Sequence, residues 1–161
     1  MTAAQLLDLG GHSYGAHMEL EPRPISRYAP NVSHLHEDSF KAHHQRPFFL
    51  SRLLGIDEAT GGDFGMRVVH ARPGAHAATA WHYHTGALQI VYCVRGWEQL
   101  ELEDGTSVRL EAGSCLNIPP GMGHRELDYS DDFEVIVITS PADMGTVEID
   151  PPADVPDRAL D

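Results

Sequence analysis

Two histidines two residues apart are the most chemically informative feature of this sequence. His82 and His84 lie in the segment WHYH, and a β-strand directs alternate side chains to one face, so both imidazoles are predicted to point the same way. Gln89 follows five residues after His84, which leaves room for a turn that brings its amide oxygen alongside. A turn at Pro120-Gly121 can return a third imidazole, that of His124. The spacing predicts one metal ion held by His82, His84, Gln89 and His124.

The ligand types indicate a catalytic rather than a structural ion. Imidazole and amide groups suit a divalent transition metal, and Fe, Zn, Ni, Mn and Cu all remain open. Three or four protein ligands leave positions for water, O2 or substrate. Because all four ligands are neutral, the ion keeps its full charge and attracts anionic or chelating substrates. Gln89 either ligates the ion directly or hydrogen-bonds a water bound to it.

Three further residues are candidates for the lining of the pocket. Val91 and Cys93 share the strand parity of Gln89 and are expected to face the same cavity. Cys93 is interpreted as an inert packing residue in preference to a reactive thiol. His70 lies on the preceding predicted strand, and alternation alone leaves its direction open between the cavity and the surface.

The remaining elements are predicted to be short strands separated by turn signals. Such a series is typical of an antiparallel barrel or sandwich. The predicted strands are 64–71, 81–84, 88–94, 98–103, 106–110, 115–118, 124–127 and 133–139. Residues 1–46 are expected to form an irregular arm, 47–145 the barrel, and 146–161 an acidic, proline-rich tail.

The two halves of the predicted site resemble the two motifs of the cupin superfamily. The first motif has glutamine where the family usually has glutamate, and its positions are His82, His84, Gln89 and Gly96. The second motif matches at every position: Gly113, Pro119, Gly121 and His124. The closing segments PPG, HRE, SDD and SPAD are similar to those of a bacterial subgroup of small single-domain cupins that carries this glutamine.

The resemblance implies an all-β, single-domain cupin, a double-stranded β-helix or jelly-roll barrel, with an irregular N-terminal arm. It favours a non-haem Fe(II) dioxygenase-type oxidoreductase acting on a small chelating organic substrate, and a homodimer. The alternatives are a non-redox metal-assisted lyase, isomerase or cyclase, a non-catalytic small-molecule-binding cupin, and a structural barrel with a vestigial site.

Residues beside the ligands are expected to lie outside the site. Trp81 and Tyr83 alternate away from the two histidines and are predicted to pack outside the barrel. Arg125 and Glu126 are interpreted as part of an exposed rim. The histidines of the arm are interpreted as a solvated stretch, and their role is left open: His34, His36, His43 and His44.

Composition excludes several classes of partner. The 161 residues carry a net charge of −13 with only 11 Lys and Arg, which argues against binding to nucleic acid or anionic membranes. No apolar run approaches the roughly 20 residues of a membrane span, and the first ten residues lack the pattern of a signal peptide. A cytoplasmic protein with a small-molecule partner is therefore expected.

Overall fold

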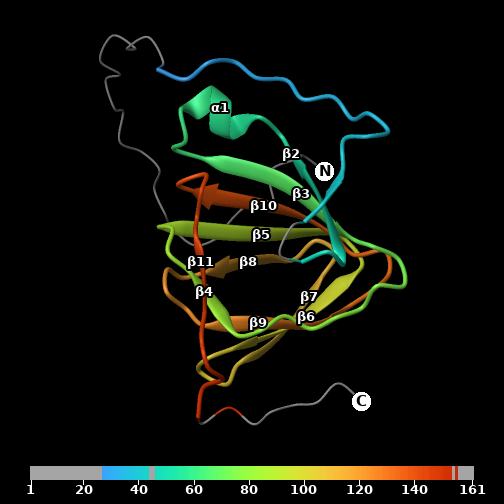
Figure 1. The fold of residues 1–161 in the computed structure, drawn as a ribbon, viewed down its shortest axis with the longest axis vertical. Coiled ribbons are helices and arrows are strands. Elements are labelled where there is room, and N and C mark those ends of the chain that lie inside the picture. The colour runs from blue at the N-terminus through green and yellow to red at the C-terminus, as the bar shows by residue number, and fades with distance from the viewer. Residues whose placement is uncertain (1–26, 44–45, 154, 156–161) are drawn as a thin grey trace, which may run out of the picture.

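Two antiparallel sheets make up the fold in this computed structural model, which describes residues 27–43, 46–153 and 155 (Figure 1). The six-stranded sheet has the order β1 (Lys41–Ala42), β2 (Phe49–Leu53), β3 (Gly65–Ala71), β10 (Glu134–Ser140), β5 (Leu88–Arg95) and β8 (Cys115–Ile118). The five-stranded sheet has the order β11 (Thr146–Glu148), β4 (His82–His84), β9 (His124–Tyr129), β6 (Trp97–Leu102) and β7 (Ser107–Glu111). The predicted all-β class is confirmed.

Alternation along the strands builds the core between the sheets. On β5, Val91 and Cys93 are buried, whereas Tyr92 and Val94 on the opposite face are each 43% exposed. The pattern on β10 is the same, since Val135 and its alternate neighbours are buried. The cluster of buried apolar residues comprises Phe49, Val69, Ala71, Val91, Cys93, Leu100, Leu110, Ile118, Tyr129, Phe133, Val135 and Val137.

The turn between β5 and β6 depends on a glycine. Gly96 has φ +68°, a conformation that L side chains rarely adopt. A Cβ atom there would lie 2.8 Å from the Cα atom of Phe133. The backbone of Phe133 thus lies too close to Gly96 for any side chain there. Gly96 therefore determines how the chain turns from β5 into β6.

Strands also form where the sequence predicts the arm and the tail. β1 lies in the predicted arm and pairs with β2, Lys41 opposite Ser51. β11 lies in the predicted tail and pairs with β4, Thr146 opposite His84. The division of the chain at residues 46 and 145 stays a prediction, but both segments contribute to the sheets that carry the site.

The single helix of the described residues, α1 (Ile56–Thr60), joins β2 to β3. It starts after Gly55 and ends at Gly61, both of which have positive φ. Among the described residues, no helix combines the length and the apolar character that crossing a membrane requires.

Candidate metal site

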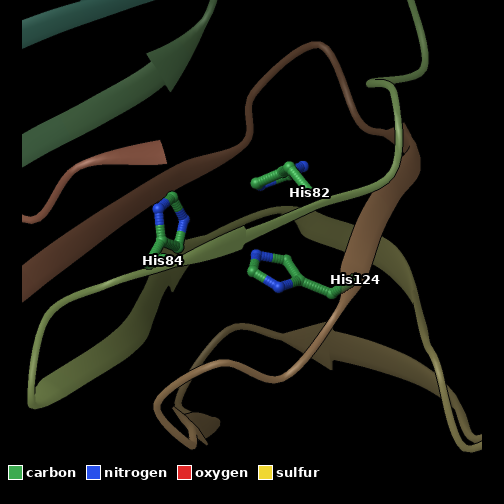
Figure 2. A group of neighbouring side chains, drawn as sticks. All are labelled: His82, His84 and His124. Carbon is green, nitrogen blue, oxygen red and sulfur yellow. The ribbon is translucent and has the colours of Figure 1, made fainter. Parts of the chain in front are cut away.

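Strands β4 and β9 bring the three predicted histidines together inside the fold. His82 and His84 point to one face of β4, and His124 on β9 lies directly opposite His82 in the ladder. One ring nitrogen from each of the three residues lies within 4.8 Å of the other two. Figure 2 shows the three rings converging. All three are buried, with His124 at 0% exposure.

Backbone carbonyl groups orient all three imidazoles in the same way. A carbonyl oxygen only accepts hydrogen bonds, so a ring Nδ1 beside one carries the proton and leaves the Nε2 lone pair for a metal. The Nδ1 donors and their acceptors are His82 to Ala80 O at 2.9 Å, His124 to Met122 O at 2.9 Å and His84 to Gly145 O at 3.3 Å. The backbone therefore presets ligation through Nε2.

Two buried polar atoms at this place fit a bound cation. Within the described residues, Nε2 of His124 and Oε1 of Gln89 are buried and have no hydrogen-bond partner. An unsatisfied buried polar group costs about 1–3 kcal/mol, so such atoms normally have a use. An imidazole lone pair and an amide oxygen are both metal donors. Ligation by Gln89 itself stays a prediction.

Burial also keeps the histidines in the protonation state that a metal needs. It lowers the pKa of His82 to about 4, and the Arg46 guanidinium contributes to the decrease. Burial likewise lowers the pKa of His84 to about 4, with a further contribution from the neighbouring His124. Both imidazoles are thus neutral at pH 7 and available as ligands.

A small cavity of about 60 Å³ opens beside His84, between the two sheets. Its lining includes two residues that the sequence predicts at the site, Gln89 as a ligand and Val91 as a pocket residue. The charged residues around it are a group that the sequence-based interpretation did not assign to the site: Arg46, Arg67, Glu98 and Glu126. The cavity is therefore more polar than the apolar pattern of the surrounding strands predicts.

Arg46 and Glu126 form an ion pair against His82. Nη1 of Arg46 lies 2.9 Å from Oε1 of Glu126, and Nη2 donates to Nε2 of His82 at 2.6 Å. The hydroxyl of Thr79 donates to the second carboxylate oxygen of Glu126. Burial would raise the pKa of Glu126, but the positive charge of Arg46 and the hydrogen bond from Thr79 bring it below its usual value. For His82 to ligate a metal through Nε2, this atom must give up its hydrogen bond from Arg46.

The expectation that Arg125 and Glu126 form an exposed rim is wrong. Glu126 is 8% exposed and faces the cavity, as its shared parity with His124 on β9 could have indicated. Arg125 lies on the other face, where it pairs with the buried Glu101 at 2.8 Å. Its guanidinium covers the ring of Trp81, which is buried at 3% exposure.

Glu98 is the second carboxyl group at the cavity, and its state differs from that of Glu126. It is 5% exposed on β6. Burial, and next the negative charge of Glu126, raise its pKa well above the usual range. The pKa values of the two carboxyl groups at the cavity are thus shifted in opposite directions, that of Glu98 upward and that of Glu126 downward.

Other predicted residues lie away from the cavity. His70 stays on the outer face of β3, because Arg67, Val69 and Ala71 form the inner set, and its ring packs against Phe40 at 4.3 Å. The Cys93 thiol is buried in the core and donates to the carbonyl of Arg95 at 3.4 Å.

The arm histidines are divided between the cavity and the surface. His43 lines the cavity beside Arg46. His34 and His36 are exposed, and His44 lies outside the described residues.

Comparison with known proteins agrees with this architecture. Residues 67–139 match the sequence profile of the cupin domain. KdgF from Halomonas sp. is similar in structure at 25% sequence identity, with a TM-score of 0.57 over 70% of this chain and 94% of that one. No curated protein matches the sequence.

Two more distant structures share the fold alone. The polyketide cyclase RemF from Streptomyces resistomycificus is 20% identical, with a TM-score of 0.52 over 82% of this chain and 88% of its own. A mutant salicylate 1,2-dioxygenase from Pseudoaminobacter salicylatoxidans, in complex with gentisate, is 16% identical, with a TM-score of 0.51 over 63% of this chain and 29% of its own. The profile match and the two facing antiparallel sheets lead to one conclusion: residues 67–139 of this chain form a small cupin domain.

Proposed function

We propose that this protein is a metal-dependent enzyme that transfers a proton on a small, chelating organic substrate. Its reaction class is that of a non-redox lyase, isomerase or cyclase. The observation that carries the proposal is the buried carboxyl group of Glu98, whose pKa is raised by burial, in a cavity that His84 of the histidine group also lines. A buried carboxyl group with a raised pKa holds its proton more tightly than a free one and is a candidate general acid.

His82, His84 and His124 are the residues that would hold a divalent transition ion, with Gln89 beside them. Such an ion, when bound, polarises a carbonyl or hydroxyl oxygen of the substrate. The neutral charge of all four donors leaves that polarising charge undiminished.

The protein side chains have distinct tasks in this proposal. Glu98 gives a proton to the substrate atom that becomes basic. Both oxygens of Glu126 are engaged, one by Arg46 and the other by Thr79, so this carboxylate positions Arg46 and is not the free base. The cavity volume of about 60 Å³ favours a small substrate.

A non-haem Fe(II) dioxygenase is the second candidate. It is favoured by the composition of the ligand group, which contains three histidines and no carboxylate. This leaves room on the ion for both a chelating substrate and O2. The buried carboxyl group of Glu98 in the cavity favours an enzyme over a purely binding cupin.

The experiment follows deuterium incorporation from D2O into a panel of 2-oxo and 2-hydroxy acids by NMR. It uses metal-reconstituted protein, under nitrogen and in air. We expect exchange without O2 consumption, lowered about 100-fold or more in Glu98→Gln. The exposed Glu103 provides the control variant Glu103→Gln, which should match wild type.

Two results would reject the proposal. Turnover that requires and consumes O2 would replace it with the oxygenase. Exchange at the wild-type rate in Glu98→Gln would remove Glu98 as the acid.

We further propose that the protein forms a homodimer and that its partner molecules are small metabolites. The exposed Tyr92 and Val94 on the outer face of β5 support a contact between copies of the six-stranded sheet. Light scattering on purified protein measures the mass directly, and a monomer at micromolar concentration would contradict it.

A further inference from the structure

Arg67 is a half-buried cation that forms no ion pair with the described residues. It projects from β3 with the inner set of residues, and its Nε is buried with no hydrogen-bond partner. No carboxylate of the described residues lies within 4.0 Å of the Arg67 nitrogens, although other charged side chains of these residues do form ion pairs. A buried unpaired charge is strongly unfavourable, and an apolar residue of the same volume would stabilise the fold better.

A second cation lies near it and adds to the imbalance. The positive charge of Arg46, after burial, lowers the pKa of Arg67. Arg46 is compensated by Glu126, and burial raises the pKa of Glu98, which disfavours the charged form of this carboxyl group. The guanidinium of Arg67 is therefore the charge in the cavity that no partner compensates, and a divalent ion would add two more positive charges.

Arg67 stands where a substrate would enter. It lines the inner cavity and also an outer hollow of about 220 Å³ between the arm and the segment before β11. His43, Arg46 and His84 line both spaces as well. A molecule in the hollow therefore lies near His84 and the two guanidinium groups, and also near Asp143, the one carboxylate of the lining.

We propose that Arg67 binds a carboxylate of the substrate, which makes the substrate a small organic acid. A second oxygen of that acid, next to the carboxylate, would face the histidine group. The guanidinium fork matches a carboxylate in two parallel hydrogen bonds, and Arg46 adds attraction without direct competition because Glu126 holds it. This inference rests on the proposed function for the role of the site, but carboxylate binding itself can be measured without metal.

The test is a thermal-shift titration with pyruvate and with its uncharged amide, pyruvamide, at constant ionic strength. Both metal-loaded and chelator-treated protein are titrated. Pyruvate should raise the melting temperature of wild type in both forms, and pyruvamide should not. Arg67→Met should weaken the apparent affinity for pyruvate about tenfold or more. The control is Arg109→Met, an exposed arginine on β7 that stacks on Trp97 and should leave the affinity unchanged.

A second readout separates binding from a structural role. Ligand-free Arg67→Met should melt at or above the temperature of ligand-free wild type, because a buried unpaired charge is removed. An arginine that supports the fold would give a lower melting temperature. Arg67→Lys keeps the charge but loses the fork, so it should bind pyruvate several-fold more weakly than wild type, and it serves if the methionine variant does not fold.

The proposal is overturned if pyruvamide stabilises as well as pyruvate, or if the Arg67 variants keep wild-type affinity. A protein that binds pyruvate through Arg67 but holds no metal would retain this inference and reject the proposed enzyme. The reverse result would reject only the carboxylate subsite.

Discussion

Replacement of Arg46 by methionine should destabilise the fold strongly, although Arg46 belongs to the predicted arm. Arg46 and Glu126 are 2.9 Å apart, and their side chains are only 20% and 10% exposed. At an effective dielectric constant of 20, two unit charges at this distance attract by about 6 kcal/mol. Removal of one partner leaves the other charge buried, for which the typical cost is about 3–5 kcal/mol. Loss of Arg46 also removes its repulsion of Arg67, so we expect a decrease in the free energy of unfolding of about 3 kcal/mol, the lower end of this range.

The assay is urea denaturation of metal-free protein at pH 7. The matched control is Arg95→Met, because the Arg95–Glu134 pair is longer, at 3.5 Å, and Arg95 is 62% exposed. A surface pair of this kind contributes about 1 kcal/mol or less. The double variant Arg46→Met/Glu126→Gln should be more stable than Arg46→Met alone, since it buries no lone charge. Arg46→Met with a cost no larger than that of the control would refute the reasoning.

The remaining predictions concern pH and one turn. In metal-free protein, the pKa values of about 4 for His82 and His84 lie below their usual 6.5, so the unfolded chain binds protons first as the pH falls. The free energy of unfolding should therefore decrease between pH 6.5 and about 4, and less steeply in His84→Gln; equal slopes in denaturation series would contradict this. Gly96→Ala should cost about 2–4 kcal/mol, because it combines positive φ with the close contact to Phe133, whereas Gly105→Ala has positive φ with open space around it and should cost about 1–2 kcal/mol. Similar losses for the two glycine variants in urea denaturation would show that the contact is unimportant.

The histidine group could be predicted from the sequence because its geometry is local. Strand alternation places His82 and His84 on one face, and the turn before His124 returns the chain antiparallel to β4. The all-β class follows in the same way from short strands and turn residues. The inward direction of Glu126 could also have been predicted, since it lies two residues after His124 on the same strand.

The rest of the site depends on pairings that the sequence does not encode locally. Arg46 reaches Glu126 across 80 residues, and Arg67 faces the cavity only because β3 pairs with β10 in one of two registers. His70 was left open for the same reason, since a shift by one residue would exchange the two faces. Two adjacent charged residues in the sequence, such as Arg125 and Glu126, are typical of a surface. The burial of Arg125 follows only from the strand pairing that places Glu101 opposite it.

The central claim is that the three histidines bind a metal ion, and the most direct test is the metal content of untagged protein purified without oxygen. We predict about one divalent transition ion per wild-type chain, lost in His84→Ala. His76→Ala replaces an exposed histidine that pairs with Asp131 and should retain the ion. Iron at this ratio would direct attention to O2 uptake, and zinc or nickel to the non-redox reaction. Wild-type protein with no more metal than His84→Ala would contradict the account.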